Sequence, residues 1–208
     1  MIEKLACKLG RNDEAPNIEL AEGLCKDNDI AGIKEIVDGF TGTEKAVAND
    51  CIKVLYEIGE RKPELIAGYA NEFISRLHSK NNRLAWGSMT ALAKIAEQSP
   101  KPIFEKLSEI VSAYEDGSVI TVDNSISVFA GLCKADDCYG KEALPILIKH
   151  LQNCRPKDLP QHAERAAACF NSKNANDFID ILVRRLPDLT ATGQARVKKL
   201  LKRLHDLS

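Results

Sequence analysis

The sequence has 208 residues, of which 44% are hydrophobic and 28% are charged, and its formal net charge is −1. This composition excludes an intrinsically disordered chain, and no apolar run approaches the roughly 18 residues that a membrane-spanning helix needs. Only 5% of the residues are aromatic, so the core must consist mainly of Leu, Ile, Val and Ala.

The first 28 residues predict an N-terminal cap with helices at 2–9 and 16–26. The segment from Met1 to Cys7 carries charged residues where a cleavable leader would need an apolar run, so we expect a cytoplasmic protein. The seven cysteines are scattered over apolar positions, which is typical of reduced, buried thiols and not of a disulfide framework.

Residues 29–187 contain an internal repeat with a period of about 37 residues. One series of apolar pairs begins at Ile36, Phe73, Ile110, Leu147 and Leu182. A second series, between these, begins at Val54, Ala91 and Val128. Because apolar residues three and four apart share one face of a helix, both series predict helices that pair into hairpins.

The repeat helices are predicted at 29–40, 43–60, 63–79, 82–98, 101–115, 118–134, 140–153, 157–171 and 175–187. A last helix at 190–205, within a C-terminal cap that covers 188–208, completes the chain. Small residues end successive apolar stripes at Gly59, Ala96 and Cys133, where they would let neighbouring helices approach closely. We therefore predict an all-α fold, a right-handed α-solenoid of about five stacked hairpins that forms a single domain over 1–208.

The 37-residue period resembles that of HEAT-like, armadillo-type helical repeats, and the segment from Arg83 to Pro100 is similar to the second helix of such a repeat. The resemblance implies a concave face lined by the second helices, but it implies no particular activity. The armadillo repeat itself is the near alternative. It has a short extra helix in each unit, for which 37 residues leave little room.

Trp86 occupies the repeat position that Asn49 and Asp123 hold in the neighbouring units, and neither of those residues belongs in a core. We therefore expect Trp86 to point at least partly to the concave face, where an exposed tryptophan is a common anchor for a partner. The alternative is that it only fills space beside a neighbouring hairpin. The candidate binding residues on this face are Lys53, Glu57, Trp86, Thr90, Lys94, Asp123 and Ser127. Their mixed charge suits a protein or peptide partner better than a phosphate backbone.

A second candidate surface is a run of positive charge near the C-terminus, formed by Arg184, Arg185, Arg196, Lys198, Lys199, Lys202 and Arg203. Such a patch can contact nucleic acid or an acidic partner, or it can keep an end cap soluble. HEAT-like DNA glycosylases that act on alkylated bases share the predicted architecture. In that family a concave tryptophan is followed four residues later by a catalytic aspartate, whereas Trp86 is followed at that distance by Thr90.

Catalytic and metal-binding signatures are weak. The segment from Gly39 to Lys45 lacks the spacing of a phosphate-binding loop. The spacing of Cys133, Cys138, His150 and Cys154 is similar to that of zinc ligands, but the intervening helix would hold the two pairs about 15 Å apart. We predict no metal and no cofactor, and a non-catalytic scaffold that binds a protein or peptide. A DNA-binding protein, in the form of a divergent alkylpurine DNA glycosylase, remains the alternative, and the oligomeric state stays open.

Overall fold

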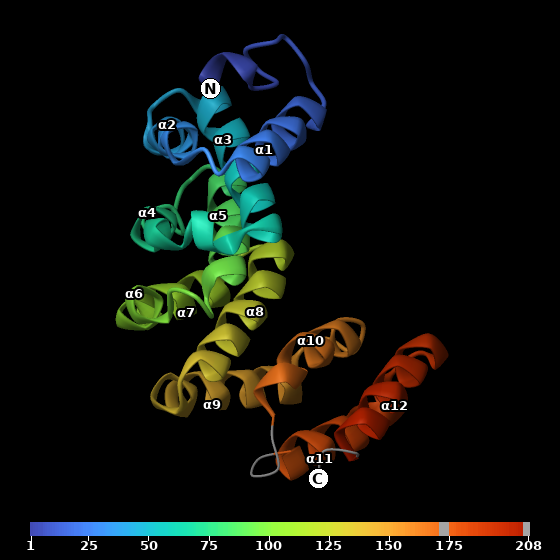
Figure 1. Cartoon of the computed structure of the whole chain (residues 1–208). Coiled ribbons are helices and arrows are strands. Elements are labelled where there is room, and N and C mark those ends of the chain that lie inside the picture. The colour runs from blue at the N-terminus through green and yellow to red at the C-terminus, as the bar shows by residue number, and fades with distance from the viewer. Residues whose placement is uncertain (171–174, 206–208) are drawn as a thin grey trace. The chain divides into compact units, whose positions relative to one another are not determined.

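Every regular element in the computed structural model is helical within the part of the chain that it describes, residues 1–170 and 175–205 (Figure 1). The chain divides into two units, Met1–Val128 and Phe129–Ser208. In the described ranges no helix combines the length and the apolar character that crossing a bilayer requires. No disulfide links any of the cysteines in these ranges.

The first unit begins with a 3-10 turn, η1 (Ile2–Lys4), and the helix α1 (Ala15–Asp27). Pro16 opens α1 in its first turn, where a missing N–H group costs nothing, and Asn28 ends it in the left-handed conformation. The helix predicted at 2–9 is wrong beyond its first turn, because only Ile2–Lys4 is helical in this segment. Leu20 and Leu24 bury the inner side of α1, which packs on α3.

Three repeat units follow α1, and the last helix of the third continues past Val128, where the first unit ends. The first pairs α2 (Ile30–Thr41) with α3 (Lys45–Arg61). The second has the 3-10 turns η2 (Pro63–Leu65) and η3 (Ala67–Tyr69), then α4 (Ala70–Ile74) and α5 (Asn82–Ile95). The third consists of α6 (Pro100–Glu105), α7 (Leu107–Asp116) and α8 (Val119–Ala135).

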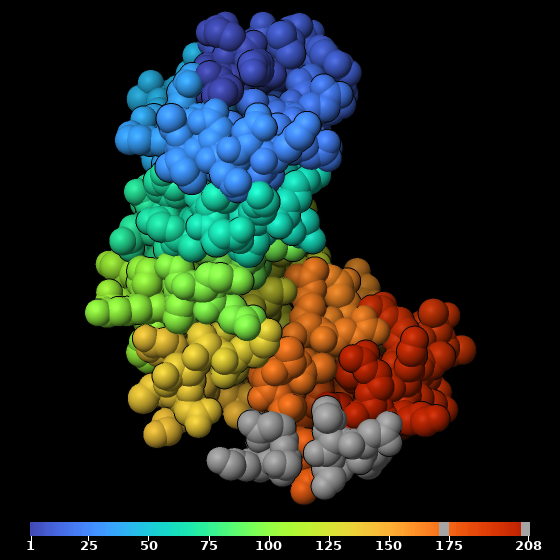
Figure 2. All heavy atoms as spheres, viewed as in Figure 1, coloured from blue at the N-terminus to red at the C-terminus, as the bar shows by residue number. Residues whose placement is uncertain are grey.

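These units stack in two rows of helices (Figure 1). The helix α3 packs on both α1 and α5, and α4 packs on α6, so second helices contact second helices and first helices contact first helices. Within the first 128 residues, successive repeats form successive bands of atoms in Figure 2. The core between the rows is mainly aliphatic, with Ile33, Ile52 and Leu55 fully buried, and the rings of Phe40 and Phe73 lie 5.7 Å apart within it.

Glycines permit the close approach of α3 and α5. A Cβ atom on Gly59 would lie 2.9 Å from Cδ1 of Ile66 and 3.0 Å from Cβ of Lys94, and one on Gly87 would lie 2.7 Å from Cγ1 of Ile52. The expectation that Gly59 lets neighbouring helices come together is thereby confirmed. Gly87 plays the same part and was not predicted.

Two predicted first helices are interrupted. The helix expected at 63–79 is two 3-10 turns and a short α4, and Gly68 lies in the second of these turns. The helix expected at 101–115 is divided at Lys106 into α6 and α7. This division gives the third unit the short extra helix of the armadillo arrangement, so the expectation that 37 residues leave little room for such a helix is wrong there.

The second unit contains α9 (Asp137–Asn153), α10 (Leu159–Ala166) with the 3-10 turn η4 (Ala167–Cys169), α11 (Ala175–Arg185) with η5 (Leu186–Asp188), and α12 (Ala191–His205). The helix α9 packs on α10 and α11, and α12 packs on both α10 and α11. Phe170 and Phe178 stack with ring centroids 3.8 Å apart. The helix expected at 157–171 ends at Ala166, and its last predicted residue lies outside the described residues.

Candidate functional site

The residues predicted to line the concave face lie on α3, α5 and α8, all within the first unit. Their spacing of four residues in each helix places those of one helix on a single side. We call this surface the second-helix face, and it comprises Lys53, Glu57, Trp86, Thr90, Lys94, Asp123 and Ser127. Lys53 is buried, and the other six residues are half-buried.

Trp86 is half-buried in the first turns of α5, and its ring packs on Tyr56 of α3. The two ring centroids lie 5.9 Å apart with an interplanar angle of 45°. Tilted aromatic pairs at this distance are favourable. One part of Trp86 therefore packs against a neighbouring helix and the rest remains accessible, while its role as an anchor for a partner stays a prediction.

Lys53 does not offer its charge to a partner, which corrects its expected place on an open face. Its side chain is only 9% exposed, and its Nζ atom lies 2.7 Å from Oε1 of Glu57 and 3.0 Å from Oε2 of Glu14. The same Nζ lies 4.9 Å from the ring centroid of Tyr56. Burial lowers the pKa of Lys53, but hydrogen bonds from its ammonium group to Glu57 and Glu14 outweigh this and hold the pKa above its ordinary value.

The ion pairs of Lys53 belong to a network that also fastens α1 to the repeats. Glu14, at the start of α1, also pairs with Arg83 of α5. Arg61 pairs with Glu57 at 2.6 Å and with Glu22 of α1 at 3.0 Å. Burial raises the pKa of Glu57, but Lys53 and Arg61 bring it below its ordinary value, so the carboxylate stays ionised.

Sequence reasoning missed Glu14, Arg83 and Tyr56. Tyr56 stands three residues after Lys53 and thus on the same side of α3, a spacing that could have identified it. No sequence signal points to Glu14, because it reaches the second-helix face from outside the repeat.

Hydroxyl and amide groups occupy the middle of the second-helix face. Oγ1 of Thr90 donates to the carbonyl oxygen of Trp86 at 2.8 Å and accepts from Nδ2 of Asn124 at 3.0 Å. Lys94 pairs with Glu60 of α3. The position four residues after Trp86 therefore supplies hydrogen bonds within the face, and it supplies no carboxylate.

The predicted basic patch is only partly assembled. Arg185 is half-buried and turns inward, with Nη2 donating to the carbonyl oxygen of Cys154 at 2.8 Å. Arg196 pairs with Glu164 at 2.5 Å. The exposed cations that remain are Arg184 on α11 and Lys198, Lys199, Lys202 and Arg203 on α12.

The four residues with zinc-like spacing are not brought together. Cys138 is exposed in the first turn of α9, whereas His150 and Cys154 stand at the other end of that helix. This agrees with the helical geometry expected from the sequence. His150 and Cys154 instead meet His162 of α10, a residue that the sequence did not connect with them.

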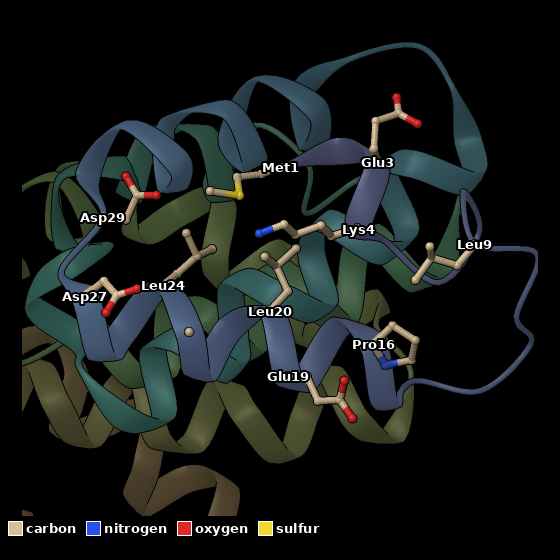
Figure 3. A pocket seen from close by; sticks show the side chains of 11 residues that line it. Met1, Glu3, Lys4, Leu9, Pro16, Glu19, Leu20, Leu24, Asp27 and Asp29 are labelled. Carbon is tan, nitrogen blue, oxygen red and sulfur yellow. The ribbon is translucent and has the colours of Figure 1, made fainter.

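A separate hollow of about 380 Å³ lies between η1 and α1 (Figure 3). Leu20, Leu24 and Met1 form its apolar part, and Figure 3 shows the side chain of Lys4 extending across it. Its lining includes the carboxylates of Glu3, Glu19, Asp27 and Asp29. This hollow belongs to the N-terminal cap and shares no residue with the second-helix face.

No protein-family model matches the sequence, and no curated protein matches it. Solved structures do match. A designed armadillo repeat protein in complex with peptide (KR)4 has a TM-score of 0.71 and 15% identity, over 93% of this chain and 90% of that one. An engineered protein has a TM-score of 0.70 and 19% identity, over 99% and 96%. Computationally designed armadillo repeat proteins for modular peptide recognition have a TM-score of 0.67 and 14% identity, over 90% and 91%.

These similarities establish the fold. The chain is an all-α solenoid of the armadillo/HEAT-like helical repeat type, as the sequence predicts.

Proposed function

We propose that this protein is a non-catalytic repeat scaffold that binds a peptide or an extended protein segment on its second-helix face. The observation that carries the proposal is the half-buried Trp86, held against Tyr56 amid hydroxyl, carboxylate and ammonium groups. A rigid aromatic ring surrounded by polar groups is typical of an anchor at a protein interface.

The surroundings of Trp86 are fixed before any partner arrives. The ion pairs of Lys53, Glu57 and Glu14 tie α1 and α3 together, and those of Arg83 extend the network to α5. A face that is already ordered loses little conformational entropy on binding. The similar designed proteins support this use of the fold, since one is in complex with a peptide and others were designed for peptide recognition.

Within the proposed site the residues have different roles. Trp86 would pack against an apolar or aromatic side chain of the peptide. Thr90, Asp123 and Ser127, which follow it along the face, would hydrogen-bond the peptide backbone. Lys53 would not contact the peptide itself. It would neutralise Glu14 and Glu57 and contact the ring of Tyr56, on which Trp86 packs.

The test uses Trp86 as its own reporter, because it is the only tryptophan in the sequence. Peptides selected from a random displayed library against the full chain would be titrated while the tryptophan emission is followed. We expect the emission to change on binding, and Trp86→Ala to weaken binding of the same peptides by about 2 kcal/mol or more, as at a typical anchor. Affinity for the variant would be measured by fluorescence anisotropy of the labelled peptide.

The matched control is Lys199→Ala, which removes an exposed side chain from α12 in the other unit. It should leave peptide affinity unchanged. Selected peptides that bind Trp86→Ala as tightly as the unaltered chain, without a change in emission, would show that the anchor assignment is wrong.

The exposed cations of α12 favour one alternative, contact with a polyanion such as duplex DNA. The same titration therefore includes a DNA duplex at low ionic strength. Binding that falls steeply with salt and with Lys199→Ala, but not with Trp86→Ala, would favour this alternative over the peptide scaffold. For a glycosylase in particular, Thr90 stands where the resemblance requires aspartate.

A further inference from the structure

Three potential metal ligands converge where α9 meets α10 in the second unit. His150 is in the last turn of α9, and Cys154 follows one helical turn later, so both lie on the same side of the helix. His162 comes from α10, which packs on α9. The two imidazoles are buried, with 7% and 2% of their residue surfaces exposed, and Cys154 is half-buried.

The ligand atoms of these three residues all lie within 4.8 Å of one another. Nε2 of His150 and Nδ1 of His162 are 2.8 Å apart, in a hydrogen bond between rings that are tilted by 56°. Around a tetrahedral Zn²⁺ the nitrogen atoms would be about 3.3 Å apart and each about 3.5 Å from the sulfur, given bonds of about 2.0 and 2.3 Å. To reach this geometry the nitrogens need to separate by about 0.5 Å, and the sulfur, which lies up to 4.8 Å from a nitrogen, needs to approach by as much as about 1.3 Å, through rotation of the three side chains.

The chemistry of the three donors favours zinc over the other common metals of proteins. Two imidazoles and a thiolate suit Zn²⁺, whereas Ca²⁺ and Mg²⁺ require oxygen ligands. The histidine pair satisfies two buried ring nitrogens, and the Cys154 thiol next to it contacts the carbonyl oxygen of Leu151 and the guanidinium group of Arg185. The cluster therefore has both the donor types and the spacing of a metal site.

Arg185 of α11 holds the cysteine segment in place. Its Nη1 atom donates to the carbonyl oxygen of Leu151 at 2.9 Å and lies 3.7 Å from Sγ of Cys154, and its Nη2 donates to the carbonyl oxygen of Cys154. Donors of this kind orient a metal-binding thiolate and stabilise its negative charge. Burial raises the pKa of the Cys154 thiol, and the Arg185 guanidinium opposes this shift.

We propose that His150, Cys154 and His162 bind one Zn²⁺ ion through Nε2, Sγ and Nδ1, with water as the fourth ligand, and that the ion fastens α10 to the end of α9. Binding releases one proton to solvent, from the Cys154 thiol. The proton of the histidine–histidine hydrogen bond moves to the other nitrogen of its own ring, and no group is oxidised or reduced. The ion thereby links two helices that otherwise meet at this end of the hairpin through packing and the histidine–histidine hydrogen bond.

The experiment titrates Zn²⁺ into the full chain after removal of metals with a chelator, and follows binding by competition with a chromophoric chelator. We expect one ion per chain and a rise in melting temperature. Co²⁺ in place of Zn²⁺ should give a thiolate-to-metal charge-transfer band. Cys154→Ser should abolish this band and weaken Zn²⁺ binding by more than the roughly 10–100-fold that losing an outer-shell partner costs. His162→Gln should weaken binding similarly.

Cys138→Ser is the matched control, since this cysteine is exposed at the opposite end of α9. It should change neither the band nor the affinity. A second readout needs no variant: bound Zn²⁺ should protect Cys154 in the unaltered chain from alkylation, as measured by peptide mass spectrometry. Alkylation of Cys154 at the same rate with and without zinc, or saturable binding that Cys138→Ser removes and Cys154→Ser does not, would overturn the proposal.

Discussion

Lys53 is a buried lysine whose ammonium group lies between Glu57 and Glu14. Lys53 stands four residues before Glu57, about one helical turn away and on the same side of α3. Because that side is polar, the sequence indicates an exposed residue. The structure buries it because α1 lies over this part of α3 and brings Glu14 with it. The charge of Lys53 thus stabilises the contact between the cap and the first repeat.

We predict that Lys53→Ala lowers the free energy of unfolding by about 2 kcal/mol, because it leaves two carboxylates near one another without their shared cation. Glu57 retains Arg61 as a partner, which limits the loss. Denaturant unfolding at neutral pH measures the effect. The matched control is Lys34→Ala, which removes an exposed pair with Asp38 and should change stability by less than about 0.5 kcal/mol. Equal losses in the two variants would contradict the structural role of Lys53.

The sequence predicts which residues share the second-helix face, but it does not predict which residues they contact. The 37-residue period fixes which residues of α3, α5 and α8 are equivalent, and the helical period fixes which share a side. The pairing of Arg83 with Glu14 joins residues 69 positions apart, and Glu14 lies outside the repeat. A pattern within the repeat therefore carries no information about it. His162 lies within the repeat and was missed for a different reason, since its convergence with His150 depends on how α10 folds back on α9.

At the scale of the helices, the contact between α3 and α5 depends on Gly87. Ile52, which faces it, is fully buried on α3, and the branched stem of its side chain leaves no room to move away. Any side chain at position 87 would therefore push the two helices apart.

We predict that Gly87→Ala lowers the free energy of unfolding by about 1–2 kcal/mol, because overpacking outweighs the gain in helix propensity. The control is Gly23→Ala in α1, where an added Cβ would meet nothing within 4 Å. That variant should be stabilised by about 0.5–1 kcal/mol, the ordinary difference between alanine and glycine in a helix. Thermal and denaturant unfolding of both variants would measure the opposite signs, and a stabilised Gly87→Ala would contradict the close contact.

In the second and third repeats, the second helices follow the sequence more faithfully than the first helices do. The predicted spans at 43–60, 82–98 and 118–134 correspond to α3, α5 and α8, within a few residues at each end. These helices are buried on a broad apolar side, which gives a strong periodic signal. The first helix at 63–79 is replaced in its first half by two 3-10 turns that contain Pro63 and Gly68, and the one at 101–115 breaks at Lys106; the apolar spacing reveals neither change.

At the scale of the whole chain, the sequence predicts one domain over 1–208, whereas the contacts separate Met1–Val128 from Phe129–Ser208. In a repeat protein each unit is stabilised mainly by its neighbours, so local stability need not be uniform along the chain. The single-domain organisation remains a proposal that local stability can test.

We expect Gly87→Ala to raise native-state amide hydrogen exchange most strongly in α3 and α5, and much less in α11 and α12. Exchange followed by mass spectrometry under native conditions measures this, with Gly23→Ala as the reference that should slow exchange or leave it unchanged. A uniform increase over all helices would instead show that the chain unfolds as one cooperative domain.

The boundary between the two units falls within α8, between Val128 and Phe129, and not in a loop. A fragment that ended at this boundary would therefore interrupt α8. A fragment that ends at Val128 lacks Phe129, Ala130 and Leu132, which are all buried, and leaves the last carbonyl groups of its helix without partners. Cutting after Gly117 or after Ala135 keeps every helix whole. Of these two sites only the one after Ala135 also keeps the third hairpin whole, which makes it the natural position for truncation, circular permutation or insertion.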